Sequence, residues 1–328
     1  MKNLKGIHHV TAITSSAEKI YDFFTYILGM RLVKKTVNQD DINTYHLFFA
    51  DDEGNPGTDM TFFDFKGIGK AQRGTNEITR TGFRVPNDAA IDYWIKRFNH
   101  YKVKYDHIKD EFGRKVIYFE DFDHQYYALV SDENDHGVQS GIPWKKGPVP
   151  LEYAITGLGP IYLKVKKIVE IESVLVDNLF MRKVDTEQNR VLFEMGEGGN
   201  GARVIVEEDA NSAPALQGYG SVHHVAFRIQ DREELEAWIE HFNTLKAPHS
   251  GYVDRFYFKS LYTRMHRGLL FELATEGPGF IDDEEDYQHL GETLALPPKY
   301  RNQRAYIERV VRPIDTVRSN KSFSKEYF

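Results

Sequence analysis

The sequence predicts an α+β protein made of four copies of one module, each a strand, a helix and three further strands. The main evidence is an amphipathic helix pattern, with apolar residues at i, i+3, i+4 and i+7, that occurs four times, most weakly in the third copy along the chain. Each copy begins eleven residues after one strand position, occupied in turn by His9, Arg80, Pro160 and His224. A single module leaves a sheet edge unpaired, so we expect the modules to pair into two cupped sheets with the helices outside.

The first module is expected over residues 6–65. Its helix has a candidate capping pair, Ser15 with Glu18 three residues later. The helix should end near Gly29, because glycine suits a left-handed C-terminal cap. Turn signals containing glycine and proline separate three further predicted strands, at residues 30–37, 45–50 and 60–65.

The remaining modules are expected at residues 79–132, 157–208 and 220–275. The last one has a second capping pair, Asp231 with Glu234.

A connector rich in glycine and proline, roughly residues 136–150, separates the second and third modules. We therefore divide the chain into an N-terminal half, 1–145, and a C-terminal half, 146–328, that ends in a tail at 280–328. The tail contains an acidic run at 282–286 and a predicted helix at 300–311.

The composition excludes several classes of function. The chain has no cysteine, which rules out disulfides, thiolate catalysis and cysteine-zinc sites. A net charge of −7 without any basic tract argues against nucleic acid and anionic membranes as partners. No run of about 18 apolar residues and no apolar signal region occur. We expect a soluble cytoplasmic protein, and self-association as a homo-oligomer stays open.

Two histidine doublets are the most informative feature for function. The pairs His8-His9 and His223-His224 occupy the same strand position in the first and last modules, whereas the two middle modules have no histidine there. This selective placement suggests a ligand role rather than a requirement of the fold. Successive side chains of a strand point to opposite faces, so only one histidine of each doublet is expected to face the cleft. Alternation alone leaves open which one.

A glutamate in the last module completes a candidate metal site. Glu272 lies within an apolar strand, where a carboxylate is costly to bury unless it is paired or binds a metal. Two histidines and Glu272 would form the triad associated with non-haem Fe(II) oxygenases. The last strand of the first module has no carboxylate at the matching place, which would leave coordination positions open. The alternative is a buried ion pair of Glu272 with Arg255 or Arg264.

Longer blocks of sequence carry a resemblance to a known family. They are GMRLVKKTVNQD at 29–40, SVHHVAF at 221–227, VDRFYF at 253–258 and FELAT at 271–275. With these blocks the chain resembles the vicinal-oxygen-chelate superfamily of glyoxalases, bleomycin-resistance proteins and dioxygenases. Within it, the chain is most similar to hydroquinone-type ring-cleaving (extradiol) dioxygenases, over nearly its whole length. The resemblance implies metal ligands on the first and last strands of a module.

The resemblance also implies which residues bind the metal. The second histidine of each doublet would be a ligand, so the metal site would consist of His9, His224 and Glu272. The implied metal is Fe(II), with Mn(II) as the other candidate.

By the same resemblance, Arg255 and Tyr262 would face the substrate and, with His223, act in catalysis. His8 and Thr11 are weaker candidates for contacting the substrate. Two other interpretations stay open, because Tyr262 could simply pack and Arg255 could neutralise the neighbouring Asp254.

These ligands impose a requirement on the architecture. Side chains from the first and fourth modules must approach one ion within roughly 2.0–2.2 Å. We therefore expect the first module to pair with the fourth around the metal, and the second with the third in a metal-free pair. Sequential pairing would separate His9 from Glu272.

The functional hypothesis is an Fe(II)-dependent dioxygenase that opens the ring of a small aromatic diol with O2. The sequence does not choose between a hydroquinone and a catechol. One alternative is a glyoxalase-like lyase, isomerase or thiol transferase, although these enzymes commonly use a second carboxylate from the partner module. Another is a non-catalytic protein that sequesters an aromatic compound, although such proteins usually have two modules and lack the triad.

Overall fold

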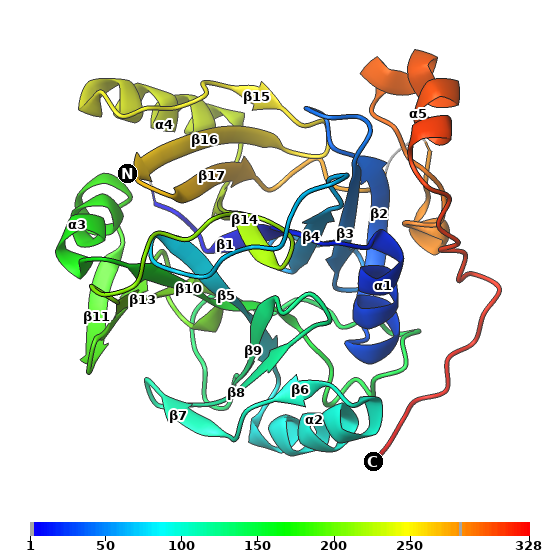
Figure 1. The fold of residues 1–328 in the computed structure, drawn as a ribbon, viewed down its shortest axis with the longest axis horizontal. Coiled ribbons are helices and arrows are strands. Elements are labelled where there is room, and N and C mark those ends of the chain that lie inside the picture. Colours follow the sequence, from blue (N-terminus) through cyan, green and yellow to red (C-terminus); the bar gives the residue numbers. More distant parts are fainter. Residues whose placement is uncertain (1–2, 282–283) are drawn as a thin grey trace.

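The computed structural model describes residues 3–281 and 284–328. Asp282 and Asp283 of the acidic run lie outside the described residues. The chain folds as an α+β protein with two mixed β-sheets, and the module helices lie at the periphery of the molecule (Figure 1).

Each of the four modules begins with a strand followed by a helix, as predicted. In the first and third modules the helix continues into a π-helical turn. The first contains β1 (Ile7–Ile13), α1 (Ala17–Asp22), the turn Phe23–Ile27, β2 (Arg31–Val37), β3 (Tyr45–Ala50) and β4 (Asp59–Phe63). The second contains β5 (Glu77–Val85), α2 (Asp88–Tyr101), β6 (Lys104–Tyr105), β7 (Lys109–Glu111), β8 (Arg114–Glu120) and β9 (Tyr126–Ser131).

The second half of the chain repeats this order. The third module contains β10 (Gly157–Val165), α3 (Ile168–Ser173), the turn Val174–Asn178, β11 (Arg182–Glu187), β12 (Arg190–Glu194) and β13 (Arg203–Glu208). The fourth contains β14 (Ser221–Ile229), α4 (Arg232–Leu245), β15 (Val253–Asp254), β16 (Lys259–His266) and β17 (Leu269–Thr275).

The sheets combine modules that are not all neighbours in sequence. The first sheet has the strand order β15-β16-β17-β14-β1-β4-β3-β2, so it joins the first module to the fourth. The second sheet has the order β11-β12-β13-β10-β5-β9-β8-β6, with β7 paired to β8, and joins the second module to the third. Both junctions are antiparallel pairs of first strands, β1 with β14 and β5 with β10. The boundary between halves at residue 145 stays a prediction.

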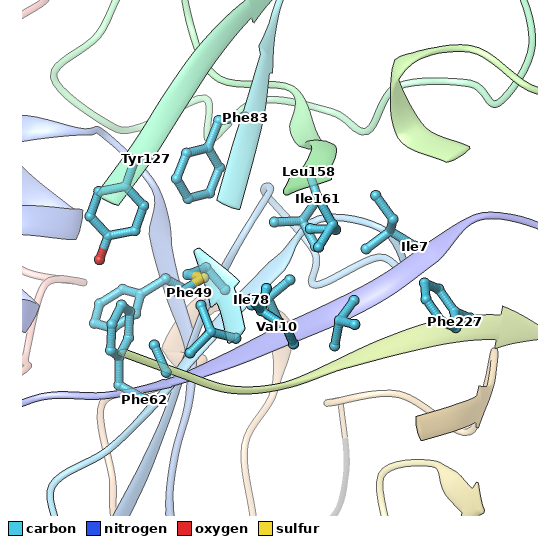
Figure 2. Packing of buried hydrophobic residues seen from close by; sticks show 14 of the residues in the cluster. Ile7, Val10, Phe49, Phe62, Ile78, Phe83, Tyr127, Leu158, Ile161 and Phe227 are labelled. Atoms are coloured by element: carbon cyan, nitrogen blue, oxygen red, sulfur yellow. The ribbon is translucent and has the colours of Figure 1, made fainter. Parts of the chain in front are cut away.

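A large apolar core fills the space between the two sheets. Figure 2 shows residues from β1, β5, β10 and β14 packed together, among them Val10, Phe83, Ile161 and Phe227. Burying a side chain of this size contributes about 1.5–3 kcal/mol relative to leaving it exposed. Because side chains alternate along a strand, the burial of Val10 here places its neighbours on β1 on the opposite, cupped face.

The two helix-capping predictions had different outcomes. The Asp231 side chain caps α4 by accepting a hydrogen bond from the Glu234 N–H at 3.0 Å, which confirms that pair. The Ser15 prediction was wrong, because Ser16 is the N-cap of α1. The Ser15 hydroxyl instead donates to Asp123, a partner 108 residues away that no local pattern could reveal.

The segment after β17 lies against β2 at the edge of the first sheet. It contains 3₁₀ turns at Tyr287–His289 and Pro298–Gln303 and the helix α5 (Arg304–Val310), close to the helix predicted at 300–311 (Figure 1). The Ala295 N–H donates to the Lys35 carbonyl at 2.9 Å, which extends the sheet edge. A fully buried ion pair, Lys34 Nζ to Glu285 Oε2 at 2.9 Å, fastens the segment to β2.

None of the helices within residues 3–281 and 284–328 has the length and apolar character needed to cross a membrane.

Breaking the buried ion pair should weaken the fold. We expect Lys34→Met to lower the free energy of unfolding by about 3–5 kcal/mol, because the buried Glu285 would lose the ammonium group that lies 2.9 Å from it. Urea denaturation measures this change. The matched control is Lys183→Met, since Lys183 pairs with Glu172 at the surface and should contribute no more than about 1 kcal/mol. Equal effects of the two variants would contradict the assigned role of the buried pair.

Candidate metal centre

The junction of β1 and β14 brings the two histidine doublets together. His9 lies opposite Ala226, and Thr11 lies opposite His224. The register shifts between Ile7 and His9 on one side of this contact, and between Thr11 and Ala12 on the other. The extra residues at these two β-bulges are His8 and His223, the first members of the doublets. Bulges re-aim side chains, so both rings of a doublet can contact each other despite strand alternation.

Three side-chain atoms converge at this junction. The Nε2 atoms of His9 and His224 are 3.3 Å apart, and Glu272 Oε2 lies 3.2 Å and 2.9 Å from them. All three residues are buried. β17 runs parallel to β14 and places Glu272 opposite Ala226, beside His224. The cluster fits the imidazole and carboxylate set of a metal site.

Hydrogen bonds to His8 fix the proton of His9. His8 Nε2 lies 3.0 Å from the Thr275 carbonyl oxygen, which can only accept, so this nitrogen carries the proton. Burial, followed by the neighbouring His9, lowers the pKa of His8 to about 3, so its ring is neutral at pH 7. His8 Nδ1 must then accept from His9 Nδ1, 2.9 Å away. With its proton held on Nδ1, His9 can present the lone pair of Nε2 to a cation in the cluster.

The second doublet repeats the contact. The Nδ1 atoms of His223 and His224 are 2.8 Å apart, so one ring donates to the other. Burial is the main cause that lowers the pKa of both rings, to about 3 for His223. When His224 Nε2 binds a cation, its Nδ1–H is the donor, and His223 carries its own proton on Nε2. Such outer hydrogen bonds orient metal-bound histidines.

Glu272 supplies the negative charge of the cluster. Burial alone would raise the pKa of this carboxyl, but the nearby His9 and His224 hold it well below its usual range. Within the described residues, neither carboxylate oxygen accepts a hydrogen bond of normal geometry. A buried carboxylate beside two imidazole nitrogens is stabilised by a bound cation, so a metal fits here. The alternative ion pair of Glu272 with Arg255 or Arg264 is not formed.

Arg255, Tyr262 and Asp40 form a hydrogen-bonded group next to the cluster. Tyr262 lies opposite Glu272 across β16 and β17. The Tyr262 hydroxyl oxygen accepts from Arg255 Nε at 3.0 Å, and both terminal nitrogens of Arg255 donate to Asp40, at 3.1 and 2.9 Å. Asp254 is paired instead with Lys259, at 2.7 Å, so Arg255 does not neutralise it.

A cavity of about 420 Å³ opens beside the cluster. Its wall includes His9, His224, His223, Arg255 and Tyr262, but His8 and Thr11 are not part of it. Substrate contact by those last two residues stays a prediction, because their observed contacts are with the histidine ligands and with Thr61 and Thr275. The remaining wall combines aromatic side chains with polar ones. The aromatic residues are Phe48, Phe63, Phe65, Tyr257 and Phe258, the polar ones are Thr36, Asn38, Gln39, Asp40 and Asp41, and His46 and Leu270 complete the wall.

Sequence reasoning missed two residues of this site. His46, which the sequence analysis did not single out, lies in the cavity wall between the rings of Phe48 and Phe63, with its Nε2 2.9 Å from Thr61 Oγ1. The available signal was that His46 and Phe48 share one face of a strand. That signal identifies a site only once the position of the strand in the sheet is known.

Thr61 occupies the counterpart of the Glu272 position. In the fourth module, Ala226 lies two residues after His224, and its partner on β17 is Glu272. In the first module, Thr11 likewise lies two residues after His9, and its partner on β4 is Thr61. The place where a second carboxylate could bind the metal is therefore taken by a hydroxyl.

Comparisons with known proteins agree on one family. The profile of the Glyoxalase/Bleomycin resistance protein/Dioxygenase superfamily matches residues 6–128. The chain is 42% identical to the "Putative ring-cleaving dioxygenase MhqA" of Bacillus subtilis (strain 168), over 95% of this chain and 99% of that one. It is 28% identical to the "Chlorohydroquinone/hydroquinone 1,2-dioxygenase" of Sphingobium indicum, over 91% and 93% of the two chains. A crystal structure of a "putative dioxygenase" from Bacillus subtilis superposes with a TM-score of 0.88 at 32% identity, covering 97% and 99%.

Replacing His8 should weaken metal binding without unfolding the protein. We expect His8→Leu to lower the affinity for Fe(II) or Co(II) about 10–100-fold, because His9 would lose the acceptor that fixes its proton. Anaerobic titration of the metal-free protein measures the affinity. The exposed His107 gives the matched variant His107→Leu, which should bind the metal as the wild type does. An unchanged affinity in His8→Leu would contradict the orienting role.

Proposed function

We propose that this chain opens the ring of an aromatic diol with O2, because it belongs to the glyoxalase/bleomycin resistance protein/dioxygenase superfamily and, within it, to the ring-cleaving dioxygenases. The substrate would be a hydroquinone or a catechol, and the metal Fe(II), held by His9, His224 and Glu272. The observation that carries the proposal is the convergence of two imidazole nitrogens and one buried carboxylate beside a cavity with several aromatic side chains in its wall.

A bound Fe(II) ion would act as a Lewis acid on a diol hydroxyl and would mediate electron transfer between the ring and O2. The rest of the chemistry falls to the protein's own side chains. The aromatic wall would hold the ring of the diol against the metal site and keep water away from it.

Tyr262 is suited to donate a proton within the cavity. Its oxygen already accepts a hydrogen bond from Arg255, which has only donors, so the phenol proton remains for another group. Burial, together with the Glu272 charge, raises the pKa of Tyr262 above its ordinary value despite the opposing effect of Arg255. The phenol therefore stays protonated at neutral pH and would donate to a diol or product oxygen as an acid.

Arg255 and His223 would assist at the same place. Asp40 binds Arg255 through two hydrogen bonds and fixes the plane of its guanidinium. The positive charge of Arg255 would stabilise negative charge that develops on substrate oxygens. His223, in the cavity wall, would present its Nε2–H as a second donor.

Two other functions receive less support. A non-redox lyase or isomerase of this superfamily would commonly use a second carboxylate, and Thr61 stands at that position. A protein that only sequesters an aromatic compound would have no need of the buried, oriented triad.

The first test of the proposal is oxygen consumption. After anaerobic reconstitution with Fe(II), we expect O2 uptake and a ring-opened chromophore with 2-methylhydroquinone, with catechol, or with both, and no uptake by Glu272→Ala, which loses the anionic ligand. An oxygen electrode and absorption spectra provide the measurement. Full iron loading without uptake on either diol would contradict the dioxygenase function.

A second test separates Tyr262 from the metal ligands. We expect Tyr262→Phe to bind one metal per chain as before but to lower kcat about 10²–10⁴-fold, because a proton donor to the substrate is lost. Steady-state kinetics with metal analysis measures both. Tyr105→Phe, which removes a hydroxyl bonded to Asn99 in the second sheet, is the control and should leave kcat unchanged. A Tyr262→Phe enzyme with the wild-type kcat would contradict the assigned role.

A further inference from the structure

A chain of hydrogen bonds connects the cavity wall to the metal ligands. His46 Nε2 lies 2.9 Å from Thr61 Oγ1, and Thr61 Oγ1 lies 2.7 Å from Thr11 Oγ1. Thr11 Oγ1 in turn lies 3.1 Å from His224 Nε2, the atom that would bind the metal. Both threonine side chains are fully buried on the cupped face of the first sheet. The chain therefore runs from the cavity wall directly to the ligand set.

Metal binding would change what the Thr11 hydroxyl can do. A metal-bound His224 Nε2 has neither a proton to donate nor a free lone pair to accept one. The close approach of Thr11 to this atom would then no longer be a hydrogen bond, although the hydroxyl would still lie next to the metal-binding nitrogen of His224. Its proton is available either to Thr61 or to another group bound next to His224.

The direction of the chain depends on His46. Each threonine has a single hydroxyl proton, so the donor at one end fixes the direction of the whole chain. If His46 donates from Nε2 to Thr61, then Thr61 donates to Thr11. The Thr11 proton must then point away from Thr61, because the Thr11 oxygen accepts the Thr61 proton. Burial is the main cause that lowers the pKa of His46 well below its usual value, so the ring carries one proton.

The surroundings of His46 hold its ring in place for this contact. Its centroid lies 4.0 Å from that of Phe48 and 4.4 Å from that of Phe63, so the imidazole is fixed between two aromatic side chains. Thr61, its partner, stands at the counterpart of the Glu272 position. One module thus contributes a charged ligand, and the other contributes an oriented hydroxyl at the equivalent place.

We propose that His46 is a positioning residue that, through Thr61, directs the Thr11 hydroxyl proton toward an anionic oxygen or other anion bound beside His224. The inference rests on the proposed function for its relevance to O2 and diol binding. It concerns only the hydrogen bonding of this chain's own residues, so it can be tested without turnover.

The test measures how tightly a small anion binds next to the metal. Azide binding to the Co(II)-reconstituted protein is followed by visible absorption in wild type, His46→Leu and Thr61→Val. We expect roughly tenfold weaker azide binding in both variants, the loss typical of one hydrogen bond to a charged group, with one cobalt bound per chain as in wild type. His46→Gln, whose side-chain amide can donate in place of Nε2, should regain most of the affinity.

The matched control is Thr81→Val. Thr81 is a buried strand threonine of the second sheet, and its hydroxyl makes no hydrogen bond within the described residues. This variant should bind cobalt and azide as the wild type does.

Each outcome of the test separates the two proposals. Unchanged azide affinity in both variants overturns the positioning role, even if O2 uptake is normal. Loss of cobalt from both variants also overturns it, because the hydroxyls would then shape the ligands themselves. Azide binding that depends on His46 and Thr61, in a protein without O2 uptake on any diol, supports the positioning role and contradicts the dioxygenase function.

Discussion

The antiparallel contact between β1 and β14 is the constraint on which the site depends. This pair joins the first module to the fourth and brings His9 within 3.3 Å of His224, a residue 215 positions away. Two β-bulges at the junction place the first histidine of each doublet beside the second, in a way that regular pleating would not. The same contact therefore creates the ligand cluster and the hydrogen bonds that orient its rings.

The second sheet has Arg80 and Pro160 at the positions that His9 and His224 occupy in the first sheet. Its cupped face is filled by an apolar cluster of Phe112, Val116, Ala128, Val130, Tyr162, Leu192 and Ile205. Beside this cluster, Glu111 accepts from the Tyr162 hydroxyl at 2.6 Å and pairs with Arg190. In that sheet the buried Glu111 has side-chain partners, whereas in the first sheet, within the described residues, the oxygens of Glu272 have no hydrogen bond of normal geometry and lie beside two imidazoles that border a cavity. This contrast is one basis on which we propose a functional rather than an architectural role for the histidine doublets.

The sequence predicted the parts of the structure that local patterns determine. Helical periodicity located the four modules, and glycine at a positive φ of 69° ends the first helical segment at Gly29, as expected. A glutamate in an apolar strand, together with the doublets, predicted the triad's residue types. Long-range contacts decided the rest. Three features depend on which strands lie side by side, and no periodicity within one strand encodes that. They are the bulges, the hydrogen bond of Ser15 to Asp123 and the contact of His46 with Thr61.

The module pairs are nested along the sequence. The second module pairs with the third, and the first and fourth modules, which flank them in the chain, pair with each other. Closing a chain segment costs entropy that grows with the length of the free loop. Once β5 and β10 have paired, most of the residues between β1 and β14 already belong to a folded body. The remaining free loop is then far shorter than the 215 residues that separate the two histidines. The second sheet thus serves as a spacer that makes the meeting of His9, His224 and Glu272 entropically feasible.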